Sequence, residues 1–370
     1  MRTRVASGLL AALGLALALA LAGCSGGGGS SAPSAPGSGG GTTQPQSLTT
    51  QEAAQVGAEA AFDPVEQGDT ENGLYDGTMG PTYMSSSLVL QSAADGTCHN
   101  GIERTVTVIS PTEKKYETKY FYDKACTTLA RDVVADVVNN GTGESVTRTA
   151  KNYAANGTLL STRSTAFSIT GSTGNFTKTE TGSLVIGTST TPAAQYGHTE
   201  TVATTTGSNV SAITGNGAHL VNNGNPAINE SFGHSHQLNN VTKTVDSSGN
   251  VTFAGARAAQ EYKGPFGSLT LSASAPFTIG GASPFGTDSI SGSVTFDTDG
   301  DLTNVSITAT LFNGDTVTAG GSGDPITVTG TVKDSSGHTL ATFAVDQFGD
   351  GIITYANGSQ GQIIDWHVVK

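Results

Sequence analysis

From about residue 85 to the C-terminus, apolar and hydroxylated side chains alternate along the chain. In the segment DSISGSVTF, residues 288–296, the apolar side chains fall on one face and the hydroxylated side chains on the other. Residues 302–312 and 325–332 repeat this pattern. A period of two predicts β-strands, and one polar face per strand is typical of antiparallel sheets that are wet on one side.

Dipeptides that favour tight turns separate the alternating segments. Asn-Gly and Asp-Gly accept the positive φ angles of hairpin turns, and together with the alternation they indicate about fourteen to sixteen strands. The sequence therefore predicts a mainly β fold, a large antiparallel meander of hairpins that closes as a barrel or a sandwich, or that divides into two β units near residues 215–226. The dipeptides begin at Asn72, Asp76, Asp95, Asn100, Asn140, Asn156, Asn216, Asn223, Asp299, Asn313, Asp350 and Asn357.

One short helix is predicted ahead of the strands. Thr49 and Glu52 match a capping box, and the segment after them is rich in alanine. Gly57 weakens this helix, and Pro64 is expected to end it. We expect the helix to cover a sheet edge or one end of a barrel.

The first residues of the chain have the pattern of an export signal. Arg2 and Arg4 form a positive start, an apolar segment follows, and small residues precede Cys24. Residues 21–24, Leu-Ala-Gly-Cys, resemble the lipobox of bacterial lipoproteins. This resemblance implies that the signal peptide, residues 1–23, is removed and that Cys24 carries the lipid that anchors the protein to a membrane. An uncleaved transmembrane helix and an ordinary cleaved signal are the alternatives.

A low-complexity segment follows the cysteine. Residues 24–47 are rich in glycine, serine and proline and hold no large apolar side chain, so we expect a flexible tether and an antiparallel β domain over residues 48–370. The glycine run and Ser25 are similar to surface lipoproteins of Gram-negative bacteria. That similarity implies a lipid-anchored place in the bacterial cell envelope, at the outer membrane or the cell surface.

The charge and the cysteines fit an exported protein. Removing the signal changes the formal net charge from -13 to -15, and a negative surface repels phosphate backbones, so we expect no nucleic-acid partner. With Cys24 lipidated, Cys98 and Cys126 remain, and an even number of cysteines outside the cytoplasm predicts a disulfide between them. Two alternating segments flank the turn at residues 111–115, so both cysteines would stand near the open ends of one hairpin.

Four histidines form the first candidate for a metal site. His234 and His236 would share one face of a strand, and His198 and His219 could join them from neighbouring strands. No Cys, Asp or Glu stands beside His234 and His236 at ligand spacing. We therefore interpret them as solvent-facing histidines and predict no metal site.

Three carboxylates form the second candidate. Asp297, Asp299 and Asp301 lie within FDTDGDLTN, and three carboxylates suit calcium. The glycine and the glutamate that an EF-hand loop requires do not stand at their positions. A hairpin turn with acidic flanks is the favoured interpretation.

Catalytic and cofactor motifs are absent from the sequence. Apart from a Gly-x-Ser-x-Gly match at residues 23–27, which overlaps the lipobox and the glycine run, it holds no Gly-x-Ser-x-Gly, His-Glu-x-x-His, Ser-x-x-Lys or Walker motif, so we expect no catalytic residue and no cofactor. Tyr116, Tyr120 and Tyr122 form an aromatic row at strand spacing that could stack on sugar rings, although a structural role across strands is favoured. Carboxylate pairs that cleave glycans leave no local pattern.

Two functional classes stay open. The favoured class is a lipid-anchored, non-catalytic binding or structural protein of the envelope, whose partners are the membrane and a protein or glycan ligand. The alternative is a membrane-anchored hydrolase that acts on glycans or other envelope polymers. Hydroxylated strand faces favour the binding protein, whereas a pocket lined by two or three carboxylates would favour the enzyme.

Overall fold

The computed structural model describes residues 48–73, 95–141, 143–172, 174–204, 208–221, 232–264, 268–270, 278–280 and 283–369. The predicted signal peptide, the lipidation site Cys24 and the tether lie outside the described residues. Residues Pro45–Lys370 form one compact unit. The described part of the chain holds no helix that is both long enough and apolar enough to cross a membrane.

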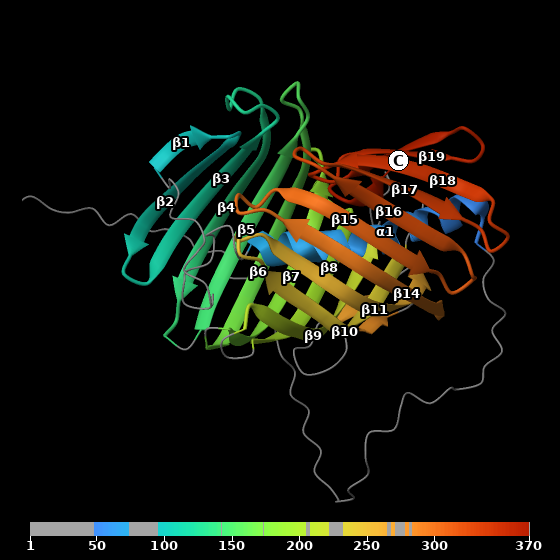
Figure 1. The fold of residues 1–370 in the computed structure, drawn as a ribbon, viewed down its shortest axis with the longest axis horizontal. Coiled ribbons are helices and arrows are strands. Elements are labelled where there is room, and N and C mark those ends of the chain that lie inside the picture. Colours follow the sequence, from blue (N-terminus) through green and yellow to red (C-terminus); the bar gives the residue numbers. More distant parts are fainter. Residues whose placement is uncertain are drawn as a thin grey trace, which may run out of the picture. The chain divides into compact units, whose positions relative to one another are not determined.

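One helix and 21 strands make up the described part of the chain (Figure 1). The helix is α1 (Thr50–Gly73). The strands are β1 (Asp95–His99), β2 (Ile102–Ser110), β3 (Glu113–Phe121), β4 (Leu129–Asn139), β5 (Gly143–Tyr153), β6 (Leu159–Ser172), β7 (Asn175–Ile186), β8 (Ala194–Thr204), β9 (Val210–Val221), β10 (Phe232–Val245), β11 (Val251–Lys263), β12 (Ser268–Thr270), β13 (Thr278–Gly280), β14 (Ser283–Phe296), β15 (Leu302–Thr310), β16 (Thr316–Ser322), β17 (Thr327–Lys333), β18 (Thr339–Asp346), β19 (Gly351–Tyr355), β20 (Gln360–Ile364) and β21 (His367–Val369).

The strands form an antiparallel meander. Each strand from β1 to β11 pairs with its neighbours in the sequence, β11 then pairs with β14, and the order continues to β21. This sheet has 19 strands, while β12 and β13 form a separate hairpin. The predicted antiparallel meander with one N-terminal helix is confirmed, but the expected number of about fourteen to sixteen strands is too low. Residues 215–221 belong to β9, which pairs with both β8 and β10.

Turn chemistry explains most of the connections. Asn100 and Gly101 both have positive φ angles, 52° and 89°, and they join β1 to β2 as the sequence predicts. The predicted hairpin at Asn156 also forms, between β5 and β6. The prediction is wrong at Asn216, because Asn216 and Gly217 lie inside β9, and at Asp95, because Asp95 and Gly96 lie inside β1.

The capping box of the helix is confirmed. Thr49 N donates to Glu52 Oε2 at 2.7 Å, and Glu52 N donates to Thr49 Oγ1 at 3.2 Å. The prediction that Pro64 ends the helix is wrong, since α1 continues to Gly73. A proline inside a helix costs about 3 kcal/mol. Complete burial of Phe62 and Val65 on either side of Pro64 offsets this cost, at about 1.5–3 kcal/mol for each large apolar side chain.

Helix α1 is a core element and does not cover a sheet edge. It packs against β14 to β18 and against β21, and Figure 1 shows it (blue) running alongside the strands of this part of the sheet. The ring of Phe62 lies 5.0 Å from that of Phe343 and 5.7 Å from that of Trp366. At Gly57 an added Cβ would stand 2.7 Å from Val332 Cγ1, so the glycine allows close approach of helix and sheet.

A smaller hydrophobic cluster lies where β3 and β4 meet the turn between β18 and β19. It consists of Ile102, Tyr120, Ala130, Val133, Ala150 and Phe348. Tyr116 and Tyr120 are both buried, as the structural role favoured for them requires. Tyr122, the third tyrosine of the row, is 41 % exposed and lies at the edge of this cluster.

Candidate functional site

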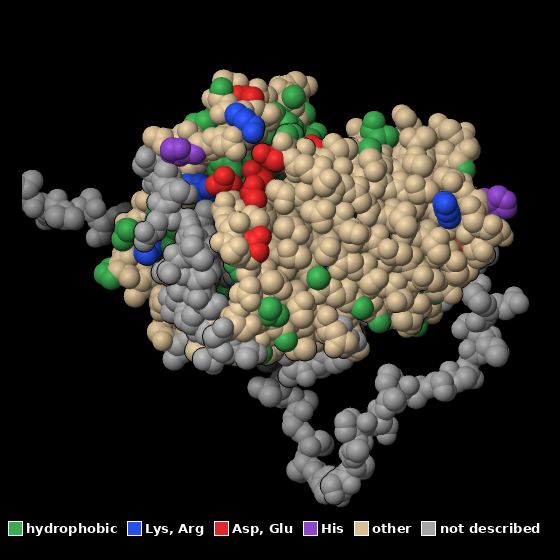
Figure 2. All heavy atoms as spheres, in the orientation of Figure 1, with side chains coloured by type: hydrophobic (Ala, Val, Ile, Leu, Met, Phe, Trp, Pro, Cys, Tyr) green, Lys and Arg blue, Asp and Glu red, His purple; other side chains and the backbone are tan. Residues whose placement is uncertain are grey.

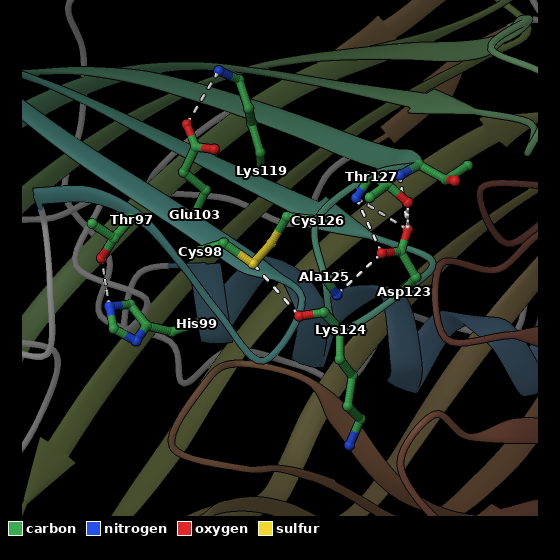
Figure 3. Close-up of a disulfide and its surroundings, with 11 residues drawn as sticks. Thr97, Cys98, His99, Glu103, Lys119, Asp123, Lys124, Ala125, Cys126 and Thr127 are labelled. Atoms are coloured by element: carbon green, nitrogen blue, oxygen red, sulfur yellow. Dashed lines mark hydrogen bonds and ion pairs between the residues drawn. A yellow bond between two sulfur atoms is a disulfide. The ribbon is translucent and has the colours of Figure 1, made fainter.

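The predicted disulfide joins β1 to the loop between β3 and β4. Cys98 and Cys126 are bonded with a Cα–Cα distance of 6.0 Å (Figure 3). The same loop is ordered by Asp123, whose carboxylate accepts hydrogen bonds from the backbone N–H groups of Ala125 and Thr127. The disulfide and this turn together fix the position of Lys124 and Tyr122.

A pocket of about 210 Å³ opens beside this loop. One wall comes from the β1–β2 turn and the β3–β4 loop, and the other from the β14–β15, β16–β17 and β18–β19 turns. Its aromatic residues are Tyr120, Phe121, Tyr122 and Phe348. The ring of Tyr122 is partly exposed and meets that of Phe348 at 6.3 Å and 89°. The hydroxyl of Tyr122 donates to the backbone oxygen of Tyr153 at 2.7 Å, which holds the ring in place.

Carboxylates dominate the charge of this pocket. On the face of the molecule in Figure 2, acidic side chains gather in one area, and most of the remaining surface is uncharged. The acidic residues in the lining are Asp123, Asp301, Asp324 and Asp346. Asp346 Oδ1 accepts from the N–H groups of Phe348 and Asp350, so it has a turn-forming role like that of Asp123.

The other two carboxylates of the pocket are Asp301 and Asp324. Asp324 lies 3.6 Å from Lys124 Nζ in an exposed ion pair. Burial, followed by the negative charges of Asp297 and Asp324, raises the pKa of Asp301 to about 7. The predicted hairpin turn at Asp297 is confirmed, because Asp297 Oδ1 accepts from Asp299 N and Asp301 N at 2.9 and 3.0 Å.

A second candidate site lies inside the protein along one face of α1. Glu52, Glu59 and Glu66 recur every seven residues, and Asp63 lies on the same side. All four are buried. Basic and imidazole side chains from distant strands meet them, so the helix brings its carboxylates to cations that are far away in the sequence.

The histidines cluster around Asp63. His234 Nε2 lies 3.0 Å from Asp63 Oδ1, and His236 Nδ1 lies 3.2 Å from the same oxygen. His198 Nδ1 lies 3.2 Å from His236 Nε2, and His219 Nε2 lies 3.0 Å from His198 Nε2. The prediction that His234 and His236 face solvent is wrong, since all four imidazoles are buried. Their carboxylate partner comes from a helix 171 residues away, which local spacing could not reveal.

A glycine makes room for this cluster. Gly217 on β9 stands opposite His198 on β8 and opposite His236 on β10. A Cβ at Gly217 would overlap His198 Nδ1 and His236 Nε2. The Asn-Gly pair at Asn216 therefore serves the packing of two imidazoles and does not form a turn.

The charged groups around Asp63 shift one another's pKa values. Burial alone would raise the pKa of Asp63, but the positive charges of His236, Arg257 and His234 hold it well below its usual range. The pKa of His234 is raised, because Asp63 outweighs the effect of burial. Burial lowers the pKa of His198 to about 3, so this imidazole is neutral at physiological pH.

A second ionic group adjoins the histidines. Arg163 forms an ion pair with Glu66. Its Nε donates to the carboxylate of Asp365, and its Nη2 donates to the backbone oxygen of Asp365, both at 3.0 Å. His367 Nδ1 lies 3.0 Å from Glu59 Oε2. Burial lowers the pKa of His367, but Glu66 and Glu59 outweigh this effect and raise it to about 10.

One pattern in the sequence could have pointed to this interior site, although no short motif contains it. An alanine-rich helix with a glutamate every seven residues has one acidic face. The chain has few cationic residues, and several of these cations stand at alternating positions of strands. Those cations include Arg163, Arg257 and Lys263. Buried charges are almost always paired. Once the helix is known to be buried, its carboxylates are therefore expected to pair with these cations.

The chain matches no protein-family model, and neither a curated protein nor a solved structure is detectably similar to it.

Proposed function

We propose that this protein is a lipid-anchored binding protein of the bacterial cell envelope and that the pocket beside Tyr122 holds a glycan. The pocket is the observation that carries the binding half of the proposal. A partly exposed aromatic ring next to carboxylates suits sugars, because the apolar face of a sugar stacks on the ring while its hydroxyl groups donate to the carboxylate oxygens. The disulfide holds one wall of the pocket in place before the ligand arrives, which lowers the cost of ordering that wall.

Titration calorimetry with a panel of bacterial envelope oligosaccharides tests the pocket. We expect the mature protein to bind at least one of them and Tyr122→Ala to bind it at least ~10-fold more weakly, a loss of about 1.4 kcal/mol. Tyr262→Ala is the matched control, because Tyr262 is a partly buried tyrosine outside the lining of the pocket. Equal binding by the two variants, or no binding by the parent protein, would count against the proposal.

The proposed location at the cell envelope rests on the lipobox at residues 21–24. In cells that express Cys24→Ser, we expect the protein to lose its acyl chains and to leave the membrane fraction, because two or more chains are needed for firm anchoring. A Cys24→Ser variant that stays acylated and bound to the membrane would contradict the lipobox interpretation.

A hydrolase is the second candidate function, and Asp301 is the observation that favours it. A carboxyl group with a pKa of about 7 is protonated often enough near neutral pH to serve as a general acid, and Asp324 supplies a second carboxylate in the same pocket. Turnover of an envelope glycan that Asp301→Asn abolishes would establish this function. Binding without turnover would leave the protein a binder.

A further inference from the structure

Two histidines and one aspartate of the buried cluster face a common point. Asp63 Oδ1 lies 3.0 Å from His234 Nε2 and 3.2 Å from His236 Nδ1, and the three donor atoms lie within 4.8 Å of one another. Zinc binds nitrogen and oxygen at about 2.0–2.2 Å, so two ligand atoms of a tetrahedral zinc ion are roughly 3.3 Å apart. The separations around Asp63 are therefore close to those that a shared metal ion requires.

Neighbouring side chains orient these donors. Arg257 Nη1 donates to Asp63 Oδ2 at 2.6 Å, which leaves Oδ1 directed at the two imidazoles. His236 Nε2 faces His198 Nδ1 at 3.2 Å, and a proton on that Nε2 leaves a lone pair on His236 Nδ1. His236 Nδ1 is buried and makes no hydrogen bond to any residue that the structure describes. Partners of this kind fix the tautomer and the orientation of metal-binding histidines.

Hydrogen bonding alone leaves this chain of groups one proton short. The imidazoles of His219, His198 and His236 connect Glu66 to Asp63 through four contacts of 3.4, 3.0, 3.2 and 3.2 Å. When all three imidazoles are neutral, each supplies one N–H and the carboxylates supply none, so three protons serve four contacts. Either a fourth proton or a metal ion next to His236 Nδ1 completes the chain. A proton there would be poorly aligned with Asp63 Oδ1, whereas a metal ion accepts lone pairs from both atoms and from His234.

The formal charge of the cluster also calls for a cation. Four buried carboxylates meet two buried guanidinium groups and the protonated imidazole of His367, which leaves one negative charge before the other histidines are counted. A bound cation would offset this charge in a region where an unpaired charge is costly. The carboxylates belong to Glu59, Asp63, Glu66 and Asp365, and the guanidinium groups belong to Arg163 and Arg257.

We propose that Asp63, His234 and His236 bind a divalent transition-metal ion, with Zn²⁺ as the first candidate. Two imidazoles and one carboxylate suit zinc, whereas calcium and magnesium prefer oxygen ligands. The ion would tie α1 to β10 and so stabilise the fold. The metal site shares no residue with the pocket beside Tyr122, so it does not depend on the proposed function.

Metal content and Co²⁺ absorption of the mature protein test the proposal. The protein is unfolded in guanidinium with a chelator, freed of both, and refolded with Zn²⁺ or Co²⁺. We expect about one equivalent of zinc by mass spectrometry and the intense visible absorption of tetrahedral Co²⁺ with nitrogen ligands. Refolded protein that holds no metal, or shows only the weak spectrum of hydrated Co²⁺, would mean that a proton alone occupies the site and would overturn the proposal.

Variants then locate the ion. His236→Gln removes one ligand, while Gly217→Ala keeps every donor but pushes His198 and His236 apart, and we expect metal binding ~10- to 100-fold weaker in both. His338→Gln is the matched control, because it removes a histidine whose side chain is 81 % exposed. Unchanged metal binding in His236→Gln and Gly217→Ala would overturn the assignment. If these variants fail to fold, the Co²⁺ spectrum of the parent protein decides.

Discussion

Replacing Arg163 with methionine tests whether the ion pairs of Arg163 with Glu66 and Asp365 are shielded from water in solution. The guanidinium is 3 % exposed and bonds two carboxylates, those of Glu66 and Asp365, whose side chains are 6 % and 2 % exposed. Methionine is shorter than arginine but is likewise unbranched near the backbone and keeps most of its volume, and it leaves both carboxylates without this cation. Since breaking a buried ion pair costs about 3–5 kcal/mol, we expect the free energy of unfolding to fall by that amount.

Lys119 provides a matched comparison at the surface. Its ammonium group also lies between two carboxylates, 3.1 Å from Glu117 and 3.7 Å from Glu103, but it is 32 % exposed. Exposed ion pairs contribute about 0.2–1 kcal/mol, so Lys119→Met should cost far less than Arg163→Met. The contrast between the two substitutions isolates the effect of burial from the effect of losing a cation.

Guanidinium unfolding measures both variants, because the midpoint and the slope together give the free energy. Trp366, the single tryptophan of the chain, is buried and reports on the core by fluorescence, while circular dichroism reports on the sheet. Adding Asp365→Asn to Arg163→Met should restore part of the loss, since it removes one uncompensated buried charge. If Arg163→Met lowers the free energy of unfolding by no more than Lys119→Met, water reaches the charges around Arg163, and the expectation that their burial excludes water is wrong.

Two further predictions concern the disulfide and the pH dependence of stability. Replacing Cys98 and Cys126 with serine should lower the free energy of unfolding by about 3–4 kcal/mol in the chain-entropy model for a loop of this length. Guanidinium unfolding of the oxidised parent and of the variant measures this difference. Two free thiols in the parent protein would show that no disulfide forms. His367 has a folded pKa of about 10 against about 6.5 when unfolded, so the folded state binds more protons between these values and stability should fall as the pH rises through them. The raised pKa of Asp350, about 8, also makes stability fall with pH, but only up to about pH 8. Above pH 8, the melting temperature of His367→Gln should therefore decline less steeply with pH than that of the parent. Identical slopes would exclude His367 as the cause.

The sequence by itself determined most of the strands, most of the turns and the start of the helix. Alternation of side chains and the φ preference of glycine act within a few residues, so the hairpin at Asn156 and the turn at Asn100 could be predicted locally. The capping box of Thr49 and Glu52 is equally local. The pairing of Cys98 with Cys126 followed from counting, because only these two cysteines remain beside the one in the predicted lipobox.

Only the tertiary structure decided where α1 lies and what surrounds it. Packing on both sides of Pro64 overrides the local tendency of proline to end a helix. The buried helix then supplies Asp63 to His234 and His236, a partnership between residues 171 positions apart that no spacing rule contains. The same packing makes Gly217 a strand residue that leaves space for two imidazoles. Local patterns record what each segment prefers, whereas burial decides which charges and imidazoles must find partners, and burial is a property of the whole sheet around the helix.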